Sequence, residues 1–305
     1  MKKPYSSPPP AVELKSKSWF NKEAYPFTSH YFSTNEGRMH YIDEGKGDPI
    51  VFIHGTPSWS FLYRHLIKKF SATHRCLAID HLGFGLSDKP AQADYRPQAH
   101  ARRLEQWLQQ LELKDITLVV HDFGGPIGLS YALRHPEKIA RVVIANSWLW
   151  SLEHEASFRK ADKMLNSWLG KFLYLQVNLS PKVLFKEGIA KKDKFSKDIH
   201  RHYIKVFPSS SSRHALYQIA LSLLGASSWY QELKQQLPRL KEKPVLLLWG
   251  MKDKYFNPTF LERWQQLLAD PKTVYLQDAG HFIQEDAAEQ IEAAIATFVQ
   301  KETPA

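Results

Sequence analysis

Cysteine is almost absent from this chain: its 305 residues include only Cys76. A single thiol cannot form an internal disulfide, and the apolar run around it favours a buried, unreactive side chain. No stretch approaches the roughly 18 consecutive apolar residues of a membrane-spanning helix. Residues 1–18 also lack the apolar segment of a signal peptide. These absences predict a reducing compartment and a cytoplasmic protein without a membrane span.

Motifs for metals and nucleotides are missing as well. The 14 histidines show no H-E-x-x-H spacing, and one cysteine cannot build a metal cluster. Gly83 and Gly85 resemble part of a phosphate-binding fingerprint, but the third glycine and the acidic ribose partner are absent. We therefore expect neither a metal nor another cofactor.

The net charge of +10 is concentrated in one segment. Residues 151–243 contain 17 Lys and Arg against 8 Asp and Glu, whereas the rest of the chain contains 24 against 23. This segment shows no recognition helix or RNA-binding signature, so we expect no nucleic-acid partner. We interpret the charge as a solvated surface, with attraction of an anionic substrate or an anionic surface as the alternative.

One stretch, residues 118–128, predicts a strand, a sharp turn and the start of a helix. Its apolar run stops at Asp122 and turns through Gly124 and Gly125, and Pro126 suits a first helical position. This is the shape of a nucleophile elbow. An aspartate at its apex attacks an electrophilic sp3 carbon and leaves an ester on the protein, whereas a serine would need an acyl group. The alternative is that Asp122 only caps the following helix.

Two distant segments supply the partners that such a nucleophile needs. A strand pattern near residue 276 leads to His281, and another near residue 248 leads to Asp253. The order nucleophile, acid, histidine is that of the α/β-hydrolase fold. We predict that Asp253 orients His281; alternatively, it is an aspartate that begins a loop and bonds local backbone.

A loop rich in small residues predicts the oxyanion hole. The buried strand 49–53 ends in the segment 54–59, where the backbone N–H of Thr56 is a suitable donor beside that of Phe123. Loops at the carboxyl end of a strand in an open α/β sheet face the place where ligands bind.

The remaining pattern predicts one α/β domain with an insertion. We expect a mostly parallel, eight-stranded sheet flanked by helices, formed by residues 19–148 and 244–305, with a helical cap at 149–243 inserted after the sixth strand. Residues 1–18, with four prolines, are expected to be a mobile lead-in. Further expected elements are a hairpin within 27–41, helices at 61–70, 96–113 and 287–300, and strands at 75–79, 139–148, 244–249 and 273–276.

Five motifs in this order resemble the haloalkane dehalogenase family of α/β-hydrolases. They are His-Gly-Thr-Pro at 54–57, Asp-His-Leu-Gly-Phe-Gly-Leu-Ser-Asp-Lys-Pro at 80–90, His-Asp-Phe-Gly-Gly at 121–125, Trp-Gly-Met-Lys-Asp at 249–253 and Asp-Ala-Gly-His-Phe at 278–282. The match spans roughly residues 27 to 300. The resemblance implies that Asp122 is the nucleophile and that His281 activates the water that cleaves the ester. It also implies a small, apolar, electrophilic substrate; the sequence does not address the oligomeric state.

Two departures from that family leave the substrate open. The resemblance implies a tryptophan after the nucleophile and an asparagine or glutamate after His-Gly, both donors to a departing halide, where this chain has Phe123 and Thr56. Trp148, Trp150 or Trp168 are candidates to compensate. We predict a haloalkane dehalogenase-like hydrolase. The alternatives are a β-lactone-cleaving enzyme, an epoxide hydrolase that uses two of Tyr174, Tyr203 and Tyr217 as proton donors, and a ligand-binding relative without catalysis.

Overall fold

The computed structural model describes residues 17–300 and contains the eight-stranded, mostly parallel sheet expected from the sequence. The strands are β1 (His30–Ser33), β2 (Arg38–Glu44), β3 (Pro49–Ile53), β4 (Arg75–Ile79), β5 (Ile116–His121), β6 (Ile139–Ala145), β7 (Val245–Gly250) and β8 (Lys272–Leu276). Their order in the sheet is β1-β2-β4-β3-β5-β6-β7-β8. The pairs β1–β2 and β2–β4 are antiparallel and all other pairs are parallel, so β2 alone runs against the other strands. The prediction of a mobile lead-in falls mostly on residues 1–16, which lie outside the described part.

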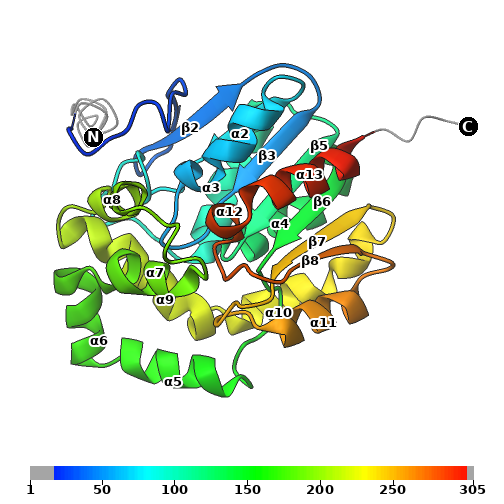
Figure 1. Ribbon diagram of the computed structural model, residues 1–305. Coiled ribbons are helices and arrows are strands. Elements are labelled where there is room, and N and C mark those ends of the chain that lie inside the picture. Colours follow the sequence, from blue (N-terminus) through cyan, green and yellow to red (C-terminus); the bar gives the residue numbers. More distant parts are fainter. Residues whose placement is uncertain (1–16, 301–305) are drawn as a thin grey trace, which may run out of the picture.

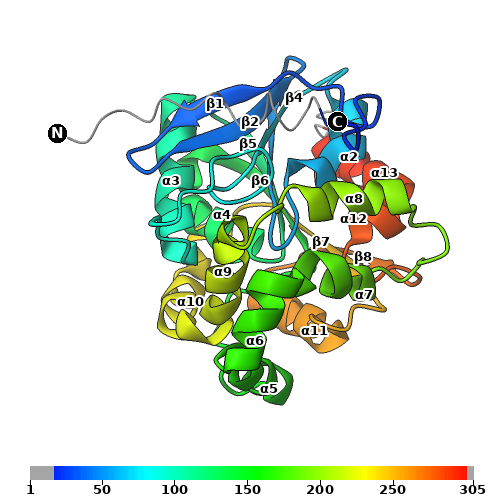
Figure 2. The ribbon, with the colours of Figure 1, turned by 90° about the vertical axis from the view of Figure 1, so that its left-hand side faces the viewer.

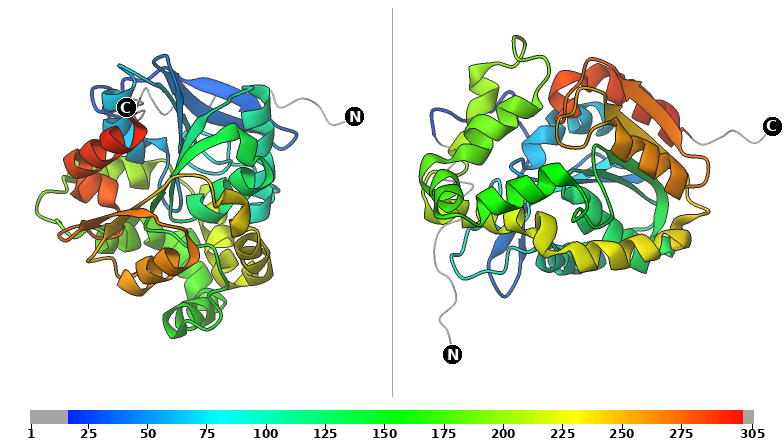
Figure 3. Two further views of the ribbon diagram at one scale, coloured as in Figure 1. Left: turned by 90° about the vertical axis from the view of Figure 1, so that its right-hand side faces the viewer. Right: turned by 90° about the horizontal axis from the view of Figure 1, so that it is seen from below.

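Helices cover both faces of this sheet, which is why its central strands are apolar throughout. Every residue of β5 and of β7 is buried, as expected for parallel strands between two helical layers. On one side lie α2 (Arg64–Phe70), α12 (Ile283–Asp286) and α13 (Ala288–Val299); on the other lie α3 (Pro97–Gln110) and α4 (Gly124–Arg134) (Figures 1 and 3). Helix α11 (Pro258–Leu267) joins β7 to β8, and the short helices η1 (Ser60–Tyr63) and η2 (Pro136–Lys138) complete the core.

A helical insertion, residues 149–243, connects β6 to β7, and the structure describes helices and no strand in it. Its helices are α5 (Ala156–Leu165), α6 (Trp168–Phe172), η3 (Leu173–Val177), η4 (Ser180–Leu184), α7 (Phe185–Gly188), α8 (Lys197–Lys205), η5 (Ser211–Arg213), α9 (His214–Gly225), α10 (Ser227–Gln235) and η6 (Leu237–Leu240). The insertion lies at one end of the sheet, with α5 and α6 farthest from the strands (Figures 1 and 2).

Several element boundaries differ by a few residues from the expectation. Strand β6 ends at Ala145 rather than at residue 148, because Asn146 has a φ of +37° and turns the backbone out of the extended conformation. The helix after the elbow begins at Gly124, so Pro126 is its third residue instead of its first. The expected helix at 61–70 is a 3₁₀ turn followed by α2.

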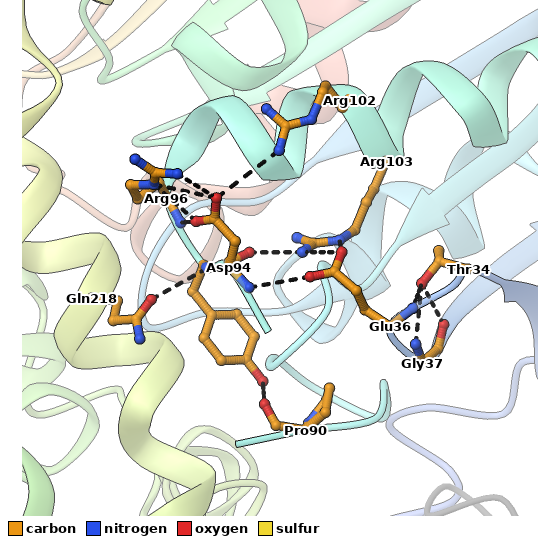
Figure 4. Close-up of polar contacts among 10 residues, drawn as sticks. Thr34, Glu36, Gly37, Pro90, Asp94, Arg96, Arg102, Arg103 and Gln218 are labelled. Atoms are coloured by element: carbon orange, nitrogen blue, oxygen red, sulfur yellow. Dashed lines mark hydrogen bonds and ion pairs between the residues drawn. The ribbon is translucent and has the colours of Figure 1, made fainter. Parts of the chain in front are cut away.

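A polar network fastens the insertion to the edge of the core (Figure 4). Glu36, in the turn of the β1–β2 hairpin, accepts hydrogen bonds from Arg103 on α3 at 2.8 and 2.5 Å, and Arg103 also donates to the carbonyl of Asp94. The backbone N–H of Tyr95 donates to Gln218 of α9 at 3.3 Å. The hairpin, α3 and α9 are thereby held against one another.

The structure bears on two predictions, one about the single cysteine and one about membrane-spanning helices. Cys76 is buried in β4, and burial raises the pKa of its thiol to about 12, which leaves it protonated and unreactive. Among the described residues, no helix has the length and apolar character needed to cross a membrane.

Candidate active site

Asp122 stands at a sharp turn between β5 and α4, as the elbow pattern predicts. Its φ of +51° lies in the left-handed region, which is uncommon for a residue with a side chain. The turn is held by Ser147, whose hydroxyl donates to the carbonyl of Asp122 at 2.6 Å. A Cβ atom at Gly125 would lie 1.8 Å from that hydroxyl, and one at Gly124 would lie 2.1 Å from the carbonyl oxygen of Ile53. Only glycine therefore fits at positions 124 and 125.

The loop after β3 approaches this carboxylate from the other side. The backbone N–H of Thr56 donates to Oδ1 of Asp122 at 2.7 Å. A Cβ atom at Gly55 would lie 2.1 Å from the same oxygen, so the loop can come this close only with glycine there. Phe123 precedes the first residue of α4, where a backbone N–H has no acceptor within the helix. The backbone N–H of Thr56 thus contacts the carboxylate, and the oxyanion hole expected from Thr56 and Phe123 stays a prediction.

Asp253 and His281 meet at the carboxyl ends of β7 and β8. Nδ1 of His281 lies 2.9 Å from Oδ2 of Asp253, and that oxygen also accepts from the side-chain amide of Asn146 at 2.7 Å. The other carboxylate oxygen accepts from the backbone N–H groups of Tyr255 and Phe256. Asp253 thus bonds local backbone with one oxygen and the imidazole with the other, so it makes the contacts of both sequence interpretations. Its catalytic role stays a prediction.

The imidazole of His281 lies between two carboxylates. Its Nε2 is 3.6 Å from Oδ2 of Asp122, and the whole side chain is buried. Burial alone would lower the pKa of His281, but the charges and hydrogen bonds of Asp253 and Asp122 outweigh it and raise the pKa to about 9. His281 is consequently protonated at neutral pH.

A second imidazole, that of His121, packs against His281 with ring centres 4.6 Å apart. Burial, followed by the charge of His281, lowers the pKa of His121 to about 3, so this ring stays neutral. Its Nδ1 lies 3.1 Å from the carbonyl oxygen of Ala145. His121 therefore fills the space behind the base without adding a charge.

The loop that carries His281 is hydrogen-bonded to the helical insertion. The backbone N–H of His281 donates to the carbonyl of Gly188 at 2.7 Å. Asp286 accepts from the backbone N–H groups of Gly280, Ala190 and Lys191 at 2.8 to 2.9 Å. The position of the base is thus set jointly by β8 and by the end of α7.

Replacing Asp286 with alanine is expected to loosen this junction. Each buried N–H group that loses its acceptor costs about 1–3 kcal/mol, so we expect Tm to fall by about 5 °C or more. Hydrogen exchange of the amides at 188–191 and 280–282 should accelerate. Asp278→Ala is the matched control, because its exposed carboxylate pairs with Lys252 at 2.7 Å and such pairs contribute little. Equal changes in both variants would remove Asp286 from this role.

A cavity of about 100 Å³ opens onto these groups. The core contributes Thr56, Asp122, Phe123 and His281, and the helical insertion contributes mainly apolar side chains and two hydroxyls. The full lining is Thr56, Pro57, Asp122, Phe123, Phe158, Tyr174, Ser180, Leu184, Ala220, Leu223, Tyr255, Phe256, His281 and Phe282. Such a cavity excludes water from the carboxylate and suits a small apolar molecule.

The tryptophans proposed as donors lie elsewhere. Trp148 and Trp150 are fully buried but are not among the residues that line the cavity. Trp148 packs edge-on against Phe123, with ring centres 4.9 Å apart, and its indole N–H has no acceptor among the described residues. Trp150 packs against Phe260 and Trp264. Trp168 is 80% exposed on the outside of the insertion.

Of the three tyrosines considered as proton donors, only Tyr174 lines the cavity. The hydroxyl of Tyr203 donates to Glu285, and that of Tyr217 donates to the carbonyl of Leu165 at 2.9 Å. Tyr255, which the sequence pattern did not single out, also lines the cavity, but its hydroxyl donates to the carbonyl of Leu184 at 2.7 Å.

Sequence reasoning missed three residues that hold the site together. Asn146 donates to Asp253 and accepts from the backbone N–H of Gly250, Ser147 fixes the elbow, and Asp286 fixes the loop of the base. A signal existed for the first two, since they follow β6 at the carboxyl edge of the sheet, where ligand-binding loops gather. None existed for Asp286, because two of its three partners, Ala190 and Lys191, lie more than 90 residues away.

Comparison with known proteins gives a consistent result. The alpha/beta hydrolase fold family matches residues 48–288. Over 275 residues the chain is 36% identical to haloalkane dehalogenase 2 of Mycobacterium tuberculosis, which covers 90% of this chain and 95% of that protein. It is also 36% identical over 283 residues to a cis-3-alkyl-4-alkyloxetan-2-one decarboxylase of Shewanella oneidensis, covering 90% and 89%. The solved haloalkane dehalogenase DatA from Agrobacterium tumefaciens is 25% identical with a TM-score of 0.80, covering 89% and 95%.

Proposed function

The chain belongs to the α/β-hydrolase fold family and is a haloalkane dehalogenase-like enzyme, and we propose that it works through a covalent ester on Asp122. One observation carries this proposal. Oδ1 of Asp122 is held by the backbone N–H of Thr56 at 2.7 Å, and Oδ2 lies 3.6 Å from the imidazole of His281, at the wall of a small apolar cavity.

In the first step a carboxylate oxygen of Asp122 attacks an sp3 carbon of the substrate. The bond from that carbon to its leaving group breaks, and the leaving group departs with the electron pair. No base is required, because the nucleophile is already an anion. With a pKa of about 9, His281 is protonated in this state and cannot compete for the electrophile.

In the second step water attacks the carboxyl carbon of the new ester and gives its proton to His281. Ester formation removes the charge of Asp122, which is one of the two carboxylates that raise the pKa of His281. The imidazole therefore becomes a base only after the first step is complete. The backbone N–H groups of Thr56 and Phe123 stabilise the tetrahedral oxyanion, whose collapse releases an alcohol and restores Asp122.

A β-lactone is the second candidate substrate, and the wall of the cavity favours it. No indole N–H lines the cavity among the described residues, so a departing halide lacks the donor expected for it. The leaving oxygen of a β-lactone belongs to a carboxylate, which delocalises its own charge. The Shewanella oneidensis relative is named for a substrate of this ring type, an oxetan-2-one. An epoxide would need a proton donor, for which Tyr174 is positioned.

Single-turnover reaction in oxygen-18 water tests the ester directly. If water attacks the carboxyl carbon, the label enters Asp122 and the first molecule of alcohol carries an unlabelled oxygen. Peptide mass spectrometry locates the label on the protein. Label in the first product, with none in Asp122, would mean that water attacks the substrate itself and would overturn the proposal. Supplying bromoalkanes, chloroalkanes, a β-lactone and an epoxide in parallel identifies the leaving group. A chain that binds these molecules without turnover would be the non-catalytic relative.

Phe123→Trp is expected to raise halide release. The indole N–H supplies a hydrogen bond to the departing anion, and bonds to charged groups contribute about 1.5–3 kcal/mol, which corresponds to about 10- to 100-fold in rate. The larger ring must displace the edge of Trp148, which packs against Phe123. Phe123→Leu is the control, since it changes the ring without adding a donor. Brisk chloride release by the natural protein would show instead that a donor other than the side chain at position 123 holds the halide.

A further inference from the structure

The outer face of the helical insertion is apolar where a solvent-facing helix is normally polar. Residues 168–177 form a continuous helical stretch, α6 and η3. Trp168, Leu169 and Phe172 point outward from it, and Trp168 is 80% and Phe172 49% exposed. Val177, at the end of η3, and Val183, in η4, are also exposed. We call these five residues the outer patch; they are five of the six large apolar side chains exposed in the described chain.

Basic residues flank the outer patch along the sequence. Residues 156–186 contain six cations, Arg159, Lys160, Lys163, Lys171, Lys182 and Lys186, and a single acid, Asp162. The next acid along the chain, Glu187, is already paired with Lys192 at 2.7 Å and with Lys254 at 3.5 Å. Residues 156–186 therefore carry a net charge of +5, half of the +10 of the whole chain, in the segment that holds the outer patch.

The same helical stretch forms the wall of the active-site cavity on its inner side. Tyr174 of η3, with Ser180 and Leu184 of η4, lines the cavity, while Trp168 and Phe172 face outward. In Figures 1 and 2, α6 lies beside α5 at the outer end of the insertion, away from the sheet. A planar surface can reach the outer patch without touching the core.

We propose that the outer patch docks on an anionic lipid bilayer surface and so brings the active-site cavity to a source of apolar substrates. Tryptophan and phenylalanine settle at the boundary between headgroups and acyl chains, and flanking lysines bind anionic headgroups. The proposal concerns attachment and does not depend on the chemistry at Asp122.

Charge argues against a second copy of this chain as the occupant. A symmetric dimer through the outer patch would place the same six cations of one protomer opposite those of the other. Such like-charge contacts oppose association. An anionic bilayer pairs with these cations instead of repelling them.

Sedimentation with lipid vesicles tests the proposal. The full chain is expected to bind vesicles of equimolar phosphatidylcholine and phosphatidylglycerol, to bind pure phosphatidylcholine far more weakly, and to be released by added salt. Trp168→Ser combined with Phe172→Ser should weaken binding on the order of tenfold or more. Lys171→Glu and Lys182→Glu should weaken it by about fivefold each or more.

Matched controls lie away from the insertion. Tyr275→Ser removes the exposed aromatic of β8, which is 49% exposed, and should leave vesicle binding unchanged. Lys46→Glu and Lys114→Glu change charge before β3 and β5, at the edge of the sheet opposite the cavity, and should have little effect. If the control and patch variants lost vesicle binding equally, net charge alone would explain the binding and the proposal would be overturned. The proposal would also be overturned if the protein did not bind anionic vesicles, or if it formed a dimer in solution that Trp168→Ser dissociates into monomers.

Discussion

Turnover is expected to fall by about 10⁴-fold or more when Asp122 is replaced with alanine, because removal of a covalent nucleophile eliminates the path on which the other catalytic groups act. No adduct should form on the protein with any electrophile. Steady-state kinetics with the substrate identified by the panel above, together with intact-protein mass spectrometry after incubation, provides the measurement.

Asp122→Asn separates the loss of the nucleophile from a change of fold. Asparagine tolerates the positive φ of the elbow, and its side-chain oxygen can still accept from the backbone N–H of Thr56. It should be folded and inactive, provided that intact mass excludes conversion back to aspartate.

Asp80→Asn is the control for a buried carboxylate that follows a strand. Asp80 accepts from the backbone N–H groups of Ser60 and Leu86, so its loss should lower Tm while adduct formation on Asp122 persists. Wild-type turnover by Asp122→Ala would refute the elbow assignment.

The sheet and the elbow could be predicted because both follow from local rules. Buried parallel strands such as β5 are nearly continuous apolar runs, and polar residues lie at or just after their ends, at the ligand-binding edge. The glycines at positions 124 and 125 indicate the sharp turn that has Asp122 at its apex. The order of three such strand ends then indicates Asp253 and His281 as candidate partners without knowledge of their distances.

Contacts across the insertion could not be predicted in the same way. Asp286 lies in a short helix whose sequence carries no motif, and its acceptor role becomes visible only when residues 188–191 fold against it. The placement of Trp148 also depends on packing, since an apolar indole after a strand can face the cavity or the layer behind it. Here it stacks on Phe256, with ring centres 4.9 Å apart. Helical periodicity indicated that the insertion is helical, but it did not indicate which faces meet the core.

His281→Gln is expected to divide the reaction at the ester. Glutamine cannot take a proton from water, so the second step should slow by about 10²- to 10⁴-fold, while Asp122 remains free to attack the substrate. An adduct should accumulate on the peptide that contains Asp122, and its mass reports the alkyl group. Asp253→Asn should also slow the second step, because it removes the carboxylate that orients the imidazole at 2.9 Å. If His281→Gln left no adduct but abolished turnover, the imidazole would be required in the first step.

The pH dependence of the two steps gives a sharper form of the same prediction. In the free enzyme the pKa of His281 is raised to about 9 by Asp253 and Asp122, against the effect of burial. Ester formation neutralises Asp122, so the pKa of His281 in the ester should lie below 9. Ester hydrolysis in the wild type should therefore rise with pH through this lower pKa, because only neutral imidazole accepts a proton. The rate of adduct formation by His281→Gln should not change with pH over the same range.

In Asp253→Asn the second carboxylate that raises the pKa of His281 is also lost, so the pH profile of ester hydrolysis should move further toward acid. A profile that stays in place in Asp253→Asn, measured by pre-steady-state quench of the ester, would show that another group sets the protonation of the base.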